Sequence, residues 1–341
     1  MIPLTLALAF ALVQRPDPAA LNEAAMKAAA EKREEEAEKL WKQAAEGAPG
    51  FFPVLFNLGF FYFSHSRYDQ AEPWLARAAR ARPDDFNSRY LLGTTLVNLD
   101  RLEAGLVEWR AALKAQPGNY KLMQIMAVNF SKGRYFKEAA EIARRALALR
   151  SDDPNAYFVA ITSCQEAGEA DTAMEIAHRA VEKFPDSARA NFEYGYHLQK
   201  LGRSEAAMPY LKKAMAADPS YEEPFYFYGE CLMNEDRYEE AVGYLRTSVR
   251  NRPDYVMASV TLARALMELE RYDEAVRELE RVLRLSPKHP QPHLLLSQVY
   301  FRMGDEDRAQ REKELSQRLR REEPGIMEAP QGRPFRPPPA P

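Results

Sequence analysis

Residues that carry out chemistry are scarce in this chain, and several familiar catalytic and cofactor-binding patterns are missing. The 341 residues include two cysteines and five histidines. No glycine-rich phosphate loop, no Cys-x-x-Cys pair and no Gly-x-Ser-x-Gly turn occurs in the sequence. Only His289 and His293 are close together, and the prolines around them place the pair in a junction instead of on one helical face. We therefore expect no catalytic residues, no metal, no cofactor and no enzymatic activity.

An excess of positive charge is missing as well. The chain has 47 lysine and arginine residues against 50 aspartate and glutamate residues, which gives a formal net charge of −3. Nucleic-acid-binding proteins need clustered cations to displace the counterions of the phosphate backbone. We therefore expect no nucleic-acid partner.

Long hydrophobic runs are also rare. The apolar stretch Met1–Val13 is too short to span a bilayer, which requires about 20 residues. It suits the core of a secretory signal peptide, although no basic residue precedes it. Residues 1–16 are therefore predicted to be a signal peptide, and the protein is expected to be exported, periplasmic or secreted, with no stable membrane span once this segment is removed. The alternatives are a cytoplasmic location, or a membrane tether formed by an uncleaved N-terminal segment.

The chain does have a regular period. Prolines recur every 34 residues, and Ser151 occupies the one vacant place in the series. The series consists of Pro49, Pro83, Pro117, Pro185, Pro219, Pro253 and Pro287. A fixed period of this length is typical of a solenoid, in which each repeat buries its apolar face against its neighbours. Apolar and small residues recur within each period at helical spacing, with a break between two groups, so each period is predicted to form two helices ended by the proline.

This pattern resembles the tetratricopeptide repeat family, whose signature places Leu-Gly, Tyr, Ala, a large apolar residue, Ala and Pro at these offsets. The first full period matches nearly throughout, with Leu55, Leu58, Gly59, Tyr62, Ala71, Leu75, Ala78 and Pro83. The period at 154–187 departs most, with Ile161 and Cys164 where Gly and Tyr are usual. The resemblance implies an all-α fold: a right-handed superhelical solenoid of antiparallel helix pairs, with about seven full repeats and degenerate repeats at both ends.

The repeats also define the expected domain boundaries. Seven repeats occupy residues 52–289, preceded by a degenerate N-terminal repeat or cap at 17–51. Residues 290–321 are polar at positions that are apolar in the other repeats, as expected of C-terminal capping helices. Residues 322–341 are dense in proline and nearly free of apolar anchors, which predicts a disordered or polyproline-like tail.

Aromatic residues recur at matching positions of the first helices. In the tetratricopeptide repeat family these helices line a concave groove, so the resemblance implies a ladder of rings that faces a partner. The predicted groove residues are Phe56, Phe60, Tyr90, Phe158, Phe192, Tyr196 and Tyr226. Such rings suit an extended peptide or an apolar helix. The other interpretation, in which the rings pack against the neighbouring first helix, stays open, and the two do not exclude each other.

The sequence thus favours a non-enzymatic protein–protein interaction scaffold. It would bind a peptide or helix of a partner protein in its concave groove, in the bacterial cell envelope. The alternative is a regulatory or substrate-recruiting subunit of an envelope enzyme or secretion complex, with catalysis in the partner. An enzyme in its own right would need a further domain, and the repeats leave no room for one between residues 18 and 321.

Overall fold

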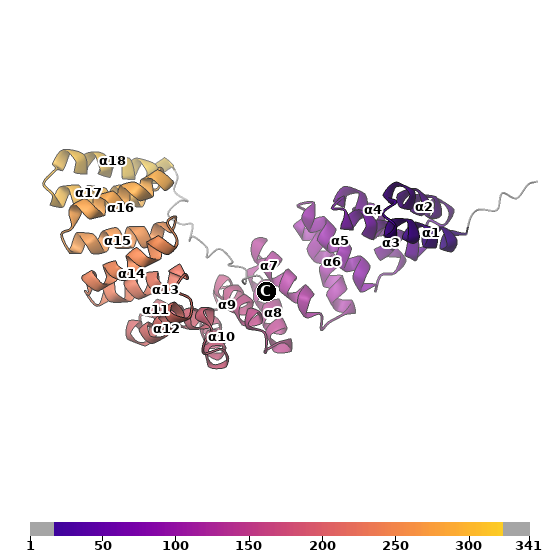
Figure 1. The fold of residues 1–341 in the computed structure, drawn as a ribbon, viewed down its shortest axis with the longest axis horizontal. Coiled ribbons are helices and arrows are strands. Elements are labelled where there is room, and N and C mark those ends of the chain that lie inside the picture. The colour runs from indigo at the N-terminus through magenta and orange to yellow at the C-terminus, as the bar shows by residue number, and fades with distance from the viewer. Residues whose placement is uncertain (1–16, 323–341) are drawn as a thin grey trace, which may run out of the picture. The chain divides into compact units, whose positions relative to one another are not determined.

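The computed structural model describes residues 17–322. The predicted signal peptide and residues 323–341 of the predicted tail lie outside the described residues. Within residues 17–322 the chain forms eighteen α-helices and no strand (Figure 1). The predicted all-α fold is therefore confirmed.

The helices alternate between first and second members of antiparallel pairs. The first helices are α1 (Pro18–Ala30), α3 (Phe52–Ser64), α5 (Phe86–Asn98), α7 (Tyr120–Lys132), α9 (Pro154–Glu166), α11 (Ala188–Lys200), α13 (Glu222–Asn234), α15 (Val256–Glu268) and α17 (Pro290–Arg302). The second helices are α2 (Glu34–Gly47), α4 (Tyr68–Ala81), α6 (Leu102–Ala115), α8 (Phe136–Leu149), α10 (Ala170–Lys183), α12 (Ser204–Ala217), α14 (Tyr238–Asn251), α16 (Tyr272–Leu285) and α18 (Glu306–Glu322).

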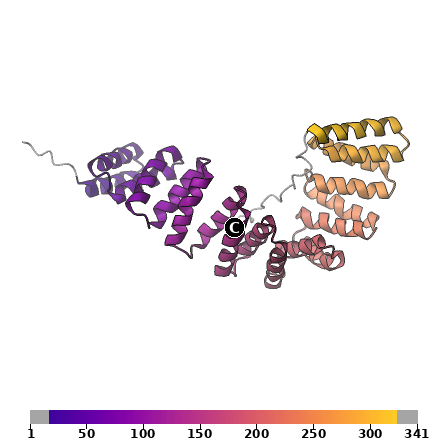
Figure 2. The same cartoon turned by 180° about the vertical axis from the view of Figure 1, so that it is seen from behind.

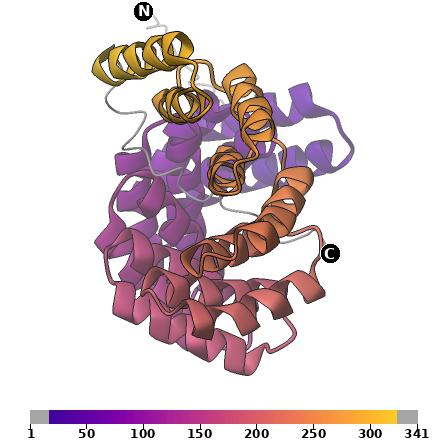
Figure 3. The same ribbon diagram turned by 90° about the vertical axis from the view of Figure 1, so that its left-hand side faces the viewer.

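The chain divides into two compact units, Met1–Arg150 and Ser151–Pro341. The boundary falls at Ser151, the place where the proline series has its vacancy. Within unit 1 the helix pairs follow one another from α1 to α8 (Figure 2). Within unit 2 the first helices α11, α13, α15 and α17 contact one another in sequence (Figure 3). Each unit has its own hydrophobic core, which contains Leu58 and Leu75 in unit 1 and Leu211 and Leu245 in unit 2.

One turn geometry joins the two helices of every pair. Each turn in the described chain places a residue in the left-handed region at the same repeat position, which is glycine at Gly168, Gly202 and Gly304. The other turns use Lys32, Ser66, Asp100, Arg134, Asp236 and Glu270, with φ between 57° and 64°. Glycine adopts this conformation freely, whereas other residues do so at a cost. The two helices of each pair are therefore joined by the same turn conformation, whichever residue occupies the left-handed position.

Small residues let the paired helices approach closely, as their periodic placement predicts. A Cβ atom added at Gly93 would lie 2.4 Å from Cδ1 of Trp109 and 2.9 Å from the carbonyl oxygen of Gly105. At Gly59 it would lie 2.8 Å from the side chain of Leu75. These distances are too short for non-bonded atoms, so a larger residue would push the helices apart. The first helix of each pair is thereby fixed against the second.

Candidate partner-binding surface

The largest group of partly exposed rings lies on first helices of unit 1. Phe52, Phe56 and Phe60 follow one another at four-residue spacing along α3, which places them on one side of the helix. Their ring centroids are 5.8 and 6.3 Å apart, and the rings of Phe56 and Phe60 are nearly parallel. Phe60 is 49% exposed, and the other two are partly exposed.

A second stack continues this surface on the neighbouring helix. Phe86 and Tyr90 on α5 are parallel, with centroids 5.8 Å apart, and both are partly exposed. The guanidinium of Arg82 lies 4.1 Å from the ring centroid of Phe52, a cation–π contact at the edge of the group. The two stacks lie at the same repeat positions of α3 and α5, and these two helices are in contact. We call Phe52, Phe56, Phe60, Phe86 and Tyr90 the aromatic face.

Sequence reasoning predicted three members of the aromatic face and missed two. Phe56, Phe60 and Tyr90 were identified through their repeat positions, whereas Phe52 and Phe86 lie one helical turn earlier. Their four-residue spacing from Phe56 and Tyr90 was a signal that could have found them.

Three of the predicted rings in unit 2 are buried, as in the packing interpretation that the sequence left open. Phe158, Phe192 and Tyr226 are 6%, 0% and 2% exposed, so these rings belong to the core. The guanidinium of Arg189 covers Phe158 at 4.4 Å from the ring centroid. Tyr196 is partly exposed, and its hydroxyl accepts a hydrogen bond from Gln165 at 2.9 Å. A role in partner binding stays a prediction for the exposed members of the set.

Two of the buried rings in unit 2 are covered by the residue that precedes the next first helix. In unit 2 this residue is Tyr221 before α13 and Tyr255 before α15, and neither caps its helix with a side-chain hydrogen bond. The ring of Tyr221 packs against Phe192, with centroids 5.0 Å apart. The ring of Tyr255 packs against Tyr226 in the same way, at 5.2 Å. A tyrosine at this junction therefore covers the ring of the preceding first helix.

Before α5 and α7 in unit 1 the same junction carries short polar residues. The carboxylate of Asp85 accepts the backbone N–H of Ser88 at 2.7 Å, and the side-chain oxygen of Asn119 accepts that of Leu122 at 3.0 Å. These are ordinary N-cap contacts, which direct the side chain to its own helix. The rings of the preceding first helices, Phe56 and Tyr90, are partly exposed.

The buried hydroxyl of Tyr226 also resists ionisation. Burial, together with the nearby carboxylate of Glu230, raises the pKa of Tyr226 above its ordinary value of 10. The Tyr226 hydroxyl donates a hydrogen bond to Glu230 at 2.6 Å. This tyrosine is therefore a neutral core residue at physiological pH.

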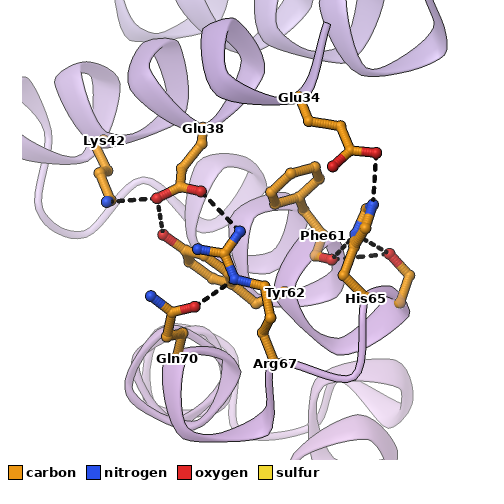
Figure 4. Close-up of polar contacts among 9 residues, drawn as sticks. Glu34, Glu38, Lys42, Phe61, Tyr62, His65, Arg67 and Gln70 are labelled. Carbon is orange, nitrogen blue, oxygen red and sulfur yellow. Dashed lines mark hydrogen bonds and ion pairs between the residues drawn. The ribbon is translucent and has the colours of Figure 1, made fainter. Parts of the chain in front are cut away.

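A polar network holds α3 in place between its neighbours (Figure 4). The carboxylate of Glu38 on α2 accepts hydrogen bonds from Lys42 at 2.6 Å, from the Tyr62 hydroxyl on α3 at 2.9 Å and from Arg67 at 2.9 Å. Burial alone would raise the pKa of Glu38, but these hydrogen bonds outweigh it and lower the pKa below its ordinary value of 4.5. Beside the network, Nε2 of His65 lies 3.2 Å from the carboxylate of Glu34. The helix that carries Phe52, Phe56 and Phe60 is thus tied to α2 through Tyr62 and Glu38.

Sites for other chemistry do not appear in residues 17–322. No group of three or more His, Cys, Asp or Glu residues in this range could hold a metal ion. Cys164 and Cys231 are buried, and neither forms a disulfide. Across the same range, no helix combines the length and the apolar character that crossing a bilayer requires.

Comparison with known families identifies the repeats. Models described as tetratricopeptide repeat match residues 28–94, 160–222 and 266–314. A model described as anaphase-promoting complex, cyclosome, subunit 3 matches residues 200–282. No curated protein sequence gives a significant match.

Several solved structures share the fold. The APC/C hetero-tetramer Cut9–Hcn1 aligns over 86% of this chain and 58% of that chain, with a TM-score of 0.55 and 16% identity. The structure of Naa15/Naa10 bound to HypK-THB aligns over 91% of this chain and 64% of that chain, with a TM-score of 0.54 and 11% identity. YrrB, described as a TPR protein with an unusual peptide-binding site, aligns over 54% and 95%, with a TM-score of 0.44 and 20% identity. At such identities the likeness shows the helical-repeat fold alone.

Proposed function

The chain belongs to the tetratricopeptide repeat family, and on this premise we propose that it is a non-enzymatic scaffold that binds a peptide or helix of a partner protein on the aromatic face of unit 1. The observation that carries the proposal is the contrast between the units. At one repeat position the rings Phe158, Phe192 and Tyr226 are buried in unit 2, whereas Phe56 and Tyr90 at the same position are partly exposed in unit 1. Aromatic side chains contribute a large share of binding energy when a partner covers them.

The aromatic face favours an apolar ligand over a charged one. Rings are stacked along α3 and along α5, and the guanidinium of Arg82 already lies over the ring of Phe52. An extended peptide or an amphipathic helix with apolar side chains on one side would cover these rings and release the water on them.

The proposed location is the cell envelope, because Met1–Val13 has the length and composition of a signal-peptide core. N-terminal sequencing of the protein isolated from its native host tests this part. A mature chain that begins between Phe10 and Asp17 supports export by a cleaved signal. An intact Met1 in protein recovered from the cytosol contradicts it.

A displayed peptide library selected on the full chain tests the binding surface. The selected peptide, labelled with a fluorophore, is titrated against the wild type and against a Phe56→Ser/Phe60→Ser variant by fluorescence anisotropy. We expect the variant to bind at least about tenfold more weakly, since two aromatic anchors are lost. Val107→Ser is the matched control, because Val107 is an apolar residue of α6 that is 59% exposed and lies outside the aromatic face.

Equal affinity of the wild type and the Phe56→Ser/Phe60→Ser variant would place binding elsewhere and overturn the proposal. If the bound sequence belongs to an enzyme, the chain is instead the recruiting or regulatory subunit of that enzyme. Whether or not the partner is an enzyme, the proposal places the contact on the aromatic face.

A further inference from the structure

The last helix pair leaves an apolar groove open at the end of unit 2. The groove lies between α17 and α18, has a volume of about 940 Å³ and includes Leu294 and Phe301 in its lining. Phe301 is 70% exposed, more than any other large hydrophobic residue in the described part of the chain. A large exposed ring beside other apolar side chains is typical of an interaction surface.

The preceding repeat shows that the same positions are buried where the array continues. Met267 and Val260 on α15 occupy the repeat positions of Phe301 and Leu294, and they are only 3% and 4% exposed. α17 packs against both α15 and α16, whereas no helix of the described chain follows α18. The groove is therefore a packing surface that the described residues leave without its cover.

The groove also carries opposite charges at its two ends. Glu306 and Asp307 line it at the beginning of α18, and Lys313 lines it about two turns later. All three are exposed, and none forms an ion pair within residues 17–322. Arg302, at the acidic end, is already engaged by Glu268 on α15 at 3.4 Å. A second copy of the groove, turned by 180°, would bring acids to the lysine and a lysine to the acids.

The apolar side chains have the same spacing as the charges. Phe301 follows Leu294 by seven positions on α17, and Lys313 follows Glu306 by seven on α18. Each pair therefore spans about 10 Å along its helix. Because the two helices are antiparallel, Phe301 lies near the acidic end of the groove and Leu294 near the lysine end. A twofold axis midway between the ends would thus match ring to leucine and lysine to acid at the same time.

We propose that the chain forms a twofold-symmetric dimer through this groove. Phe301 of each copy packs on Leu294 of the other, and Lys313 of each copy pairs with the two acids of the other. Because the symmetry repeats every contact, one substitution alters two contacts in the dimer. The dimer contact uses residues of α17 and α18 only, so it is independent of the aromatic face.

Sedimentation velocity of the full chain across a concentration series tests the dimer. We expect the wild type to dimerise reversibly and Lys313→Glu to weaken dimerisation at least about tenfold, because two attractions become repulsions. Arg311→Glu is the matched control, since Arg311 is an exposed residue of α18 that does not line the groove. Phe301→Ser should also weaken dimerisation, and its exposed ring contributes little to the core.

An exchange of charges distinguishes this dimer from other ways of filling the groove. Glu306→Lys/Asp307→Lys should be as weakly dimeric as Lys313→Glu, because each variant alone sets like charges against each other. Mixed together, the two variants should dimerise within about threefold of the wild type, since both contacts then join opposite charges. Asp305, whose carboxylate accepts the backbone N–H of Arg308 at the start of α18, is kept in both variants.

Three results would overturn the proposal. The first is a wild type that stays monomeric throughout the series. The second is a Lys313→Glu variant that dimerises as strongly as the wild type or the Arg311→Glu control. The third is a mixture of the two charge variants that dimerises as weakly as each variant alone, because the groove would then face some surface other than its own copy.

Discussion

At the scale of single residues, the side chain before a first helix can bury the aromatic ring of the preceding repeat. Tyr221 covers Phe192, whereas Asp85 turns to its own helix and Phe56 is partly exposed. The period of the sequence identifies where rings occur. It does not identify their exposure, because that depends on whether a residue of the next repeat packs on the ring or caps a backbone N–H.

Two phenylalanine variants test whether buried and exposed rings contribute differently to stability. Phe192→Ala removes a ring that is 0% exposed, so it should lower the free energy of unfolding by about 3–5 kcal/mol through lost burial and the cavity left behind. Phe60→Ala removes a ring that is 49% exposed and should cost well under half as much. Urea denaturation followed by circular dichroism measures both. Similar losses for the two variants would show that the rings are equally part of the core.

The carboxylate of Glu38 gives a pH dependence of stability. Its folded-state pKa is lowered, so its contribution is fully present above the ordinary carboxyl pKa of 4.5 and is lost as pH falls through the lower folded value. Wild type should therefore exceed Glu38→Gln in unfolding free energy at neutral pH, and the gap should close on acidification below pH 4.5. Thermal unfolding of both proteins across this pH range measures the gap. A gap that is constant with pH would show that the interaction does not depend on the charge of Glu38.

At the scale of elements, the helices and their pairing could be predicted from the sequence nearly in full. The 34-residue period, the small residues at the helix crossings and the closing prolines each have a direct physical reason, and the helix boundaries follow them. The division into two units had only one sequence signal, the serine at position 151 in place of proline. One substituted residue does not reveal how strongly neighbouring repeats pack, so this boundary required the structure.

Substitution by alanine should change the free energy of unfolding in opposite directions at two helical glycines, Gly93 and Gly243. Gly93→Ala places a Cβ against Trp109 and should lower the unfolding free energy by about 1–3 kcal/mol. Gly243 lies inside α14 with nothing within 4 Å of an added Cβ, so Gly243→Ala should raise it by about 0.5–1 kcal/mol through better helix propensity. Chemical denaturation of each variant measures the sign. Stabilisation by Gly93→Ala would contradict the close approach of α5 and α6.

At the scale of the whole molecule, the two compact units should unfold in separate transitions because each buries its own core. The chain provides a selective probe, since its three tryptophans, Trp41, Trp74 and Trp109, all belong to unit 1. Phe192→Ala should therefore lower a transition seen by circular dichroism and leave the tryptophan fluorescence transition unchanged. Leu75→Ala, at a fully buried site of unit 1, should shift the fluorescence transition by about 2–5 kcal/mol. Coincident shifts of both probes in either variant would show one cooperative unit.

The residue types found before the first helices are related to one another through the genetic code. Aspartate, asparagine, serine, histidine and phenylalanine each have codons one base away from a tyrosine codon. Across the described chain these are the residues that stand at the junction beside tyrosine itself: Phe51, Asp85, Asn119, Asp153, Ser187, Tyr221, Tyr255 and His289. At the junctions before α5 and α7, a point mutation to tyrosine would supply a ring like those of Tyr221 and Tyr255 while the period of the array stays intact. Binding surfaces in such a protein can be gained and lost over evolutionary time without passing through an unfolded ancestor.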